Sequence, residues 1–306
     1  VAILAQWVFI SCLMALGNLA LCSCGGASSS SEEDDGSDID GTEGQASAAA
    51  NVSLPRLVSL GCDCGTKLTF RRMLLDAETL PFDWIRTRIE GLLWFLRSDF
   101  EGFFNFSVVK PVPGVPGMTM YRSQLHSFWN DDPVDTSVQE KYRRRFARFQ
   151  AVDASEAPVL FVRSVATTDE LPLLSELLQE LRTRHGRRAC LLAILSYQYG
   201  HIGPITLEDH PNLLLYCLSA DVLVKYACLD RRMGNRENMS GPYILPVRCA
   251  LDWAAGGPLR ARDGAGGSLR TLPLGSLAEV EAHVTPTSWG LTGLGGLNSF
   301  EDLPCK

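Results

Sequence analysis

The chain has 306 residues, of which 46% are hydrophobic, and a formal net charge of −7. These values predict one sizeable folded domain, or at most two, and exclude a chain that is disordered throughout. The seven acidic residues between positions 27 and 50 have no basic neighbour, and the remaining 28 acids equal the 28 lysines and arginines. The folded part is therefore about neutral, and we expect no nucleic-acid partner.

The N-terminal residues predict a segment that enters a membrane. Residues 1–21 are almost entirely apolar, and about 20 such residues span a bilayer as a helix. We expect an apolar helix within residues 1–26, acting as a signal peptide or membrane anchor, and a disordered acidic, Ser-rich linker at residues 27–50. This layout favours the secretory pathway, with a membrane-anchored or secreted glycoprotein whose domain is lumenal or extracellular. Asn-x-Ser sequons agree with this location, at Asn51, Asn105 and Asn238.

Residues 51–306 predict a single α/β domain whose last part, from about residue 231, is irregular. Apolar runs typical of buried strands lie at 57–60, 158–165, 189–196 and 212–218. Helical patterns lie between them, at 66–80, 86–103, 138–152 and 168–185. This alternation favours a three-layer fold, with a mainly parallel sheet and helices on both faces.

The first strand ends in a short segment that contains two thiols, Gly61-Cys62-Asp63-Cys64-Gly65. Reacting groups collect at the carboxyl ends of strands in open α/β sheets. Gly61 allows a sharp turn or a close approach of backbone to a ligand. A thiol near a helix amino terminus is favoured in its nucleophilic form, so Cys64 is the strongest candidate for a reactive atom.

Several ordered blocks of the sequence carry a family resemblance. They are Ser59-Leu60-Gly61-x-x-Cys64, Pro81-Phe82-Asp83-Trp84-Ile85, Asp99-Phe100-Glu101-Gly102-Phe103, Leu125-His126-Ser127-Phe128, the basic segment 141–149 and Val159-Leu160-Phe161-Val162-Arg163. Together they resemble a largely uncharacterised family described as putative papain-like cysteine peptidases, over roughly residues 57–197. The resemblance implies a cysteine-dependent, peptidase-like hydrolase with Cys64 as nucleophile, and it places His126 where the family has a histidine.

A cysteine nucleophile needs a base within hydrogen-bond reach, usually a histidine. His126 is the first candidate, because it lies in a polar and aromatic block ahead of the basic helix. His201 and His210, on either side of a loop between two strands, are the fallback partners. Asp83 lies between two large aromatic residues, where a buried carboxylate needs a partner. It orients the histidine or binds substrate in one interpretation, and caps the next helix in the other.

The remaining candidates concern substrate binding. We expect backbone amides after Gly61 to stabilise an oxyanion, and Trp84, Arg144 or Arg163 to contact the substrate. The alternatives are a core position for Trp84 and a solvated helix face for Arg144. Ten cysteines occur without any C-x-x-C pair, so neither a metal site nor a cofactor is expected.

The position of Cys64 after a predicted strand also widens the range of hydrolytic reactions to consider. A nucleophile at a strand end is more typical of layered esterases and lipases than of papain, so the bond cleaved is an amide, ester or thioester, in a small-molecule or peptide substrate of unknown identity. Two other functions stay open. One is a Golgi-type glycosyltransferase, for which Asn130-Asp131-Asp132 is the nearest match to an Asp-x-Asp motif. The other is an inert binding domain in which residues 61–65 form only a tight turn.

Overall fold

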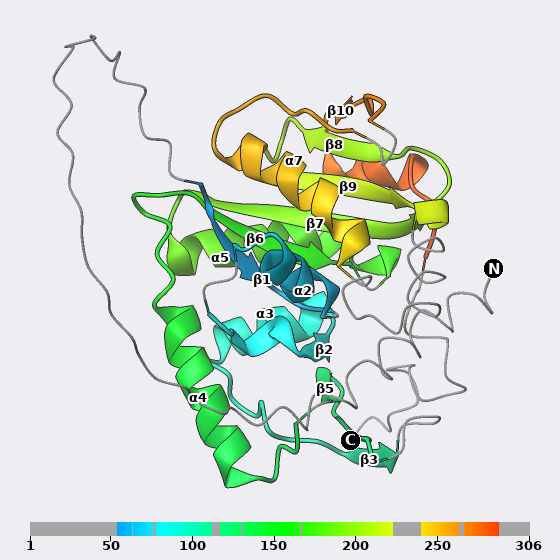
Figure 1. Ribbon diagram of the computed structural model, residues 1–306. Coiled ribbons are helices and arrows are strands. Elements are labelled where there is room, and N and C mark those ends of the chain that lie inside the picture. Colours follow the sequence, from blue (N-terminus) through cyan, green and yellow to red (C-terminus); the bar gives the residue numbers. More distant parts are fainter. Residues whose placement is uncertain are drawn as a thin grey trace, which may run out of the picture.

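A six-stranded sheet forms the centre of the domain (Figure 1). The computed structural model describes residues 54–62, 64–75, 78–111, 117–129, 131–165, 167–222, 240–262 and 266–287. The expected N-terminal helix and acidic linker, Asn51 and Asn238 lie outside these residues. Among the residues that are described, no helix has the length and apolar character needed to cross a bilayer.

The strand order in the main sheet is β1-β6-β7-β9-β8-β10. The strands are β1 (Arg56–Ser59), β6 (Val159–Ser164), β7 (Ala189–Gln198), β9 (Leu213–Ser219), β8 (Gly203–Leu207) and β10 (Leu272–Leu274). The first four in this order are mutually parallel, whereas β8 runs antiparallel to β9. The prediction of a mostly parallel α/β sheet is confirmed, and β8 is a strand that the sequence analysis missed.

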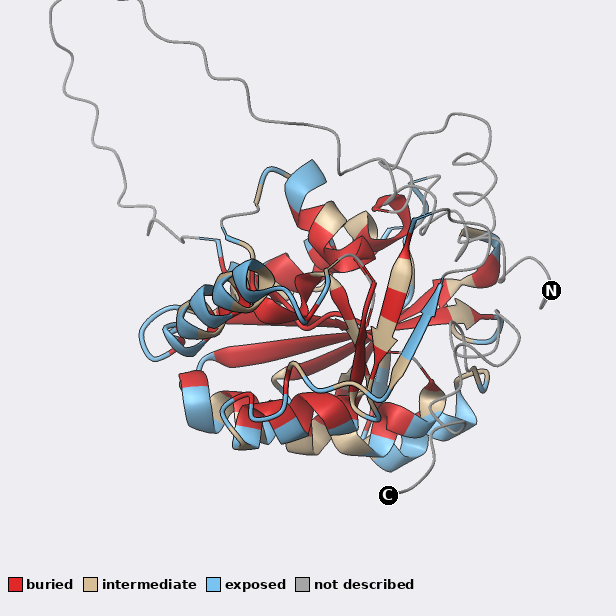
Figure 2. Cartoon of the chain, turned by 90° about the horizontal axis from the view of Figure 1, so that it is seen from below, coloured by how far each residue is buried: buried red, intermediate tan, exposed pale blue. Residues whose placement is uncertain are grey.

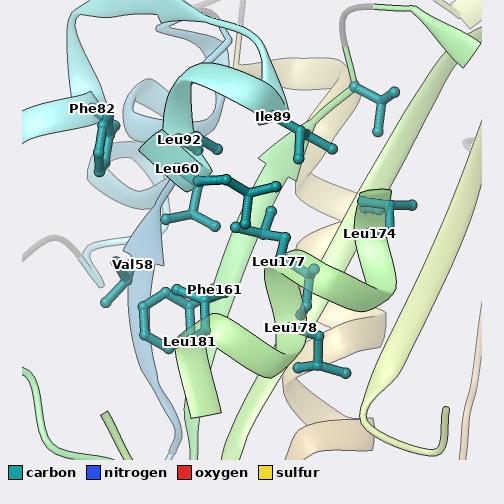
Figure 3. Close-up of a cluster of buried hydrophobic side chains, with 14 of the residues drawn as sticks. Val58, Leu60, Phe82, Ile89, Leu92, Phe161, Leu174, Leu177, Leu178 and Leu181 are labelled. Atoms are coloured by element: carbon teal, nitrogen blue, oxygen red, sulfur yellow. The ribbon is translucent and has the colours of Figure 1, made fainter. Parts of the chain in front are cut away.

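Helices cover both faces of this sheet because alternate strand residues enter two separate cores. Phe161 of β6 joins the larger core, with α3 (Ile89–Arg97), α4 (Thr136–Gln150) and α5 (Leu174–His185). Leu160 joins the smaller core, with α2 (Gly65–Arg72) and α7 (Ile244–Ala254). Figure 2 shows that the central strands of the sheet are buried and that the helices are exposed on their outer sides. Figure 3 shows part of the larger core between α3, α5 and the sheet.

A second, antiparallel sheet lies beside the main one and was not expected. Its order is β2-β5-β4-β3, formed by Ile85–Thr87, His126–Phe128, Thr119–Arg122 and Val108–Pro111. The helix expected over residues 86–103 therefore begins later, at Ile89, after β2 has ended. Strands of three or four residues show too few alternations to be recognised by periodicity, which explains the error.

Prolines and helix caps account for two further differences between the expected and the observed helices. The segment expected to open a helix at Thr168 is the 3-10 helix η3 (Thr168–Leu173), which contains Pro172. Thr167, and not Thr168, caps it by accepting from the Asp169 amide. The region after residue 231, expected to be irregular, holds α7, the short 3-10 helices η5 (Gly241–Tyr243) and η6 (Leu277–Ala282), and β10. Pro242 and Pro246 interrupt its sequence pattern, although proline is compatible with a first helical turn.

Candidate active site

The segment between β1 and α2 holds Cys64, the predicted nucleophile, and the neighbouring thiol of Cys62. Gly61 and Cys62 both have left-handed backbone conformations, with φ of +70° and +73°. For a residue with a side chain this conformation costs roughly 1–2 kcal/mol, and such strain gathers at functional sites. Cys64 follows as the N-cap of α2, and both thiols are buried. The expected strand–turn–helix arrangement around Cys64 is therefore present.

Gly61 packs against the segment that carries Asp83. A Cβ atom at position 61 would lie 2.5 Å from the Phe82 carbonyl oxygen and 3.3 Å from that of Ile85. The close backbone approach allowed by Gly61 is thus to the chain itself. Two motifs twenty residues apart in the sequence form one unit, in which the 3-10 helix η2 (Pro81–Asp83) supports the cysteine turn.

Asp83 joins η2 to α2, the helix whose N-cap is Cys64. Its Oδ2 accepts from the Leu80 amide at 2.8 Å and lies 3.1 Å from Lys67 Nζ on α2. Lys67 also donates to the Glu78 carbonyl, and both charged side chains are buried. A buried ion pair needs such additional hydrogen bonds to offset desolvation. These contacts give Asp83 a positioning role for α2, and its direct catalytic role stays a prediction.

Arg163 forms a second support beneath the turn. Its guanidinium is fully buried and donates to the Leu60 carbonyl at 3.1 Å and to the Thr87 carbonyl. It also pairs with Glu170 at 3.3 Å, and Glu170 accepts from the Ile89 amide at the start of α3. One side chain therefore joins the ends of β1, β2 and β6. Its burial favours positioning over the substrate contact expected from the sequence.

His126 lies in an aromatic cluster on β5. Its Nε2 is 2.6 Å from the Phe103 carbonyl oxygen and its Nδ1 is 2.8 Å from Ser123 Oγ. The ring packs against Phe95, Phe103 and Phe128 at centroid distances of 4.9 to 5.0 Å.

Burial lowers the pKa of His126 to about 4, so the ring is neutral near pH 7. Nε2 then donates to Phe103 and Nδ1 accepts from Ser123, which leaves neither nitrogen for the Cys64 thiol. The structure does not bring this pair together as a hydrogen-bonded couple. A role for His126 as general base stays a prediction, and it requires the ring to leave its hydrogen bonds with Phe103 and Ser123.

The other residues singled out in the sequence are His201, His210, Trp84 and Arg144, and the two histidines lie at opposite ends of the strands of the main sheet. His201 follows β7 at the carboxyl edge, as Cys64 follows β1, and its Nε2 lies 3.2 Å from the Pro204 carbonyl oxygen. His210 lies between β8 and β9, at the opposite edge. Trp84 is half-buried beneath the Arg71 guanidinium, 5.2 Å from the ring centroid. Arg144 is 60% exposed on α4 and pairs with Glu140 at 3.6 Å.

Two buried serines at the carboxyl edge were missed. Ser164 ends β6 and Ser196 lies near the end of β7, and neither hydroxyl has a hydrogen-bond partner. By strand alternation both face the smaller core, on the side of the sheet that α2 covers. On the same face, Ser59 Oγ lies 2.8 Å from Thr66 Oγ1 and accepts from the Gly61 amide. The sequence did contain a signal for these residues, because each serine lies at or near the end of a strand that is otherwise mostly apolar.

The described residues contain no cluster of three or more His, Cys, Asp or Glu side chains that could hold a metal ion. Asp131, the central acid of the Asn130-Asp131-Asp132 stretch, is bonded to Lys141 at 2.5 Å and to the Tyr142 hydroxyl at 3.0 Å. Both partners lie on α4. This carboxylate therefore has a structural role in the conformation described.

Comparison with known proteins agrees with the resemblance seen in the sequence. Residues 55–195 match the family described as "putative papain-like cysteine peptidase", which confirms the similarity expected over residues 57–197. An uncharacterised protein of Acanthamoeba polyphaga mimivirus is 26% identical over 133 residues. That alignment covers 35% of this chain and 60% of the viral protein, so it spans less than two thirds of the relative. No solved structure matches the chain.

Proposed function

Because residues 55–195 match that cysteine peptidase family, we propose that this chain is a cysteine-dependent hydrolase with Cys64 as its nucleophile. In the proposed reaction the Cys64 sulfur attacks a carbonyl carbon, and the leaving group departs with a proton. Water then cleaves the acyl-sulfur bond, which returns the thiol and releases an acid. The substrate is an amide, ester or thioester.

The observation that carries this proposal is the position of Cys64. It is the N-cap of α2, and it lies two residues after Cys62, the second of two successive left-handed residues that follow β1. Parallel α/β sheets place their reacting groups at this edge. Three separate contacts, made by Gly61, Asp83 and Arg163, support the turn and helix. A turn held this firmly is the kind of scaffold that presents a nucleophile in one geometry.

Neighbouring groups support the stabilisation of a developing oxyanion. The free N–H groups of a helix's first turn point outward at its amino end and favour negative charge there, which in α2 is next to Cys64. The unpaired hydroxyls of Ser164 and Ser196 supply two more donors at the same edge of the sheet. We assign these hydroxyls to a polar group of the substrate, because hydrogen bonds to a substrate are most effective where water is excluded.

The architecture favours a broader substrate range than peptides. Cys64 is the N-cap of a helix of 8 residues that comes after a sheet strand, as in layered α/β esterases, and it does not lie on the long helix of a papain-type domain. Small acyl esters and thioesters are therefore included in the proposal.

The apolar residues 1–21 and the acidic linker support a further proposal, that this domain is secreted or membrane-anchored within the secretory pathway.

One observation favours a second candidate, an inert binding domain. Both ring nitrogens of His126 have hydrogen-bond partners, and its ring lies in an aromatic cluster. A domain that had lost or never had catalysis would keep the same turn for stability alone. The two candidates differ in the reactivity of one sulfur atom, which can be measured directly.

Acyl trapping distinguishes these candidates. The full chain is incubated with p-nitrophenyl acetate, and peptide mass spectrometry locates acetyl groups. The hydrolase proposal expects a transient acetyl group on Cys64, and turnover that disappears in Cys64→Ala. Cys62→Gly is the matched control, because glycine relieves the left-handed strain and removes only the neighbouring thiol. Equal acetylation and turnover in wild type and Cys64→Ala would leave the inert domain as the better reading.

A further inference from the structure

Away from Cys64, a cavity of about 240 Å³ lies on the α5 side of the main sheet, and the proposed hydrolysis does not use it. Three helices, α3, α4 and α5, end around it. Its lining residues are Leu96, Phe100, Phe149, Gln150, Arg184 and His185. The segment from Arg184 to Ala189 leads directly into β7, so the cavity lies near the amino ends of the strands, whereas Cys64 follows the carboxyl end of β1.

The inner walls of the cavity are apolar and mostly aromatic. Leu96, Phe100 and Phe149 are buried, and the Phe100 and Phe149 rings meet edge to face with centroids 6.0 Å apart. Arg184 is half-buried, and its guanidinium is already paired with Glu180 at 2.8 Å and with Asp99 at 3.0 Å. Because these carboxylates neutralise the cation, the cavity has no excess positive charge to attract an anion.

His185 lines the cavity, and one of its ring nitrogens is an unused hydrogen-bond acceptor. The residue is 4% exposed, and its Nδ1 lies 3.0 Å from the Val152 carbonyl oxygen. Nδ1 must donate in this bond, since a carbonyl oxygen only accepts, so Nε2 of the neutral ring carries a lone pair. Nε2 is buried and has no hydrogen-bond partner. Burial also lowers the pKa of His185, which keeps the ring neutral near pH 7.

The ring of His185 is itself part of the aromatic wall. It stands edge to face with Phe149 at a centroid distance of 5.0 Å and lies tilted against Phe161 at 5.2 Å. Edge-to-face and offset contacts are the arrangements that aromatic rings prefer, so a further ring in the cavity would find compatible partners. Buried polar atoms in native proteins are almost always paired, so an orphaned acceptor on a residue that lines a cavity calls for a donor.

We propose that this cavity binds a small planar aromatic molecule of the phenol class, whose hydroxyl donates to His185 Nε2. The size is sufficient, because an apolar cavity of about 150 Å³ is enough to hold benzene. The chemistry needs one apolar ring and one donor. It disfavours anions, because Arg184 is neutralised, and at His185 it disfavours molecules that only accept hydrogen bonds, because Nε2 cannot donate.

The test compares two fluorinated probes of nearly equal shape, 4-fluorophenol and 4-fluorotoluene. Binding to the full chain is followed by ¹⁹F NMR line broadening over a titration in the low millimolar range, and displacement by unlabelled phenol establishes that one site is observed. We expect saturable binding of 4-fluorophenol and about three- to tenfold weaker binding of 4-fluorotoluene, because a neutral hydrogen bond is worth that factor.

A matched pair of variants assigns the site. His185→Asn keeps a side-chain amide able to donate to the Val152 carbonyl and removes Nε2, so it is expected to lose the preference for 4-fluorophenol. His210→Asn changes a histidine outside the cavity in the same way and is expected to bind like wild type. Circular dichroism of each variant establishes that it is folded.

The proposal is overturned if neither probe binds saturably, which would mean that ordered water is the donor. It is also overturned if 4-fluorotoluene binds as tightly as 4-fluorophenol, or if His185→Asn keeps the preference for 4-fluorophenol while folded. None of these results depends on Cys64, so the cavity and the proposed hydrolase function stand or fall separately.

Discussion

Gly61 and Phe82 are in contact so close that no other residue fits at position 61: a Cβ atom there would lie 2.5 Å from the Phe82 carbonyl oxygen. The same position has a φ of +70°. Steric and conformational demands therefore coincide on one residue. This contact explains why the glycine–cysteine turn and the Pro-Phe-Asp-Trp segment act as one structural unit.

Gly61→Ala is expected to destabilise the fold by at least about 2 kcal/mol, because the methyl group must displace backbone in addition to the left-handed strain. Urea unfolding measures the difference. Gly256→Ala is the control, since Gly256 has a φ of +82° with open space around it, and only the strain of about 1 kcal/mol applies. Equal effects of the two substitutions would show that the contact with Phe82 is not limiting.

Asp83→Asn is expected to cost about 3–5 kcal/mol, because it leaves the buried Lys67 ammonium without its countercharge. Glu78→Gln, which removes the exposed pair with Arg56, is expected to cost less than about 1 kcal/mol. Chemical denaturation gives both values. A variant that keeps its stability but loses p-nitrophenyl acetate turnover would instead support the catalytic role of Asp83.

Arg163→Met is expected to cost about 3–5 kcal/mol, since the buried Glu170 then loses its nearer cation and keeps the Arg88 guanidinium only at 3.9 Å. Adding Glu170→Leu is expected to recover part of that loss, which is the signature of a buried pair in a double-mutant cycle. Arg144→Met, on the exposed face of α4, is expected to change stability by less than about 0.5 kcal/mol. An additive double mutant would argue against coupling between Arg163 and Glu170.

Stability is expected to fall on acidification because of His126. Its pKa is lowered from 6.5 to about 4, so the unfolded chain binds a proton first as the pH falls. The stabilisation is complete above pH 6.5 and is lost between pH 6.5 and about 4, amounting to about 2 kcal/mol at pH 5. Urea unfolding at pH 7 and pH 5 measures this loss.

His126→Gln provides the comparison for that pH dependence, because His185 titrates in the same direction and remains in both proteins. The variant is expected to be less stable at pH 7 and to lose less stability on acidification than wild type. An unchanged difference between pH 7 and pH 5 would indicate that His126 is not buried as described. Turnover by folded His126→Gln at the wild-type rate would also exclude it as the base.

Ser164→Ala and Ser196→Ala are expected to leave stability unchanged or to raise it by up to about 1 kcal/mol, since each removes a buried hydroxyl that has no partner. Ser59→Ala is expected to cost about 1 kcal/mol, because Ser59 bonds to Thr66 and to the Gly61 amide. If the two unpaired hydroxyls bind substrate, their variants raise KM for p-nitrophenyl acetate. An unchanged KM in both would remove them from the proposed site.

The main sheet was predictable because each of its long strands is a continuous apolar run, as β6 and β7 show. The antiparallel sheet was not predictable, because β2 and β5 have three residues each and carry no measurable period. Their pairing depends on contacts between Thr87 and His126, which are far apart in the sequence. Sequence patterns describe local periodicity and not such long-range pairs.

The sequence predicted which residues follow one another in the candidate site, but it did not predict which side chains they contact. A glycine and cysteine after a strand indicated a turn there, and Gly61 and Cys62 both have left-handed backbone conformations. The surroundings of His126 were not visible in the sequence, because Phe95 and Phe103 reach it from segments before β5. Whether a histidine faces a thiol or an aromatic cluster is decided by tertiary packing.

The hydrogen bond from Arg163 to the Leu60 carbonyl has a consequence for synthesis of the protein, because it joins residues 103 positions apart. While the chain emerges from the ribosome, Cys62 and Cys64 are exposed for the time needed to translate those residues, about 5–20 s at typical rates. During that interval neither β6 nor its guanidinium is available to close the end of β1. The two thiols are then open to oxidation, so we expect a nascent chain to need the protection of a chaperone until β6 has docked.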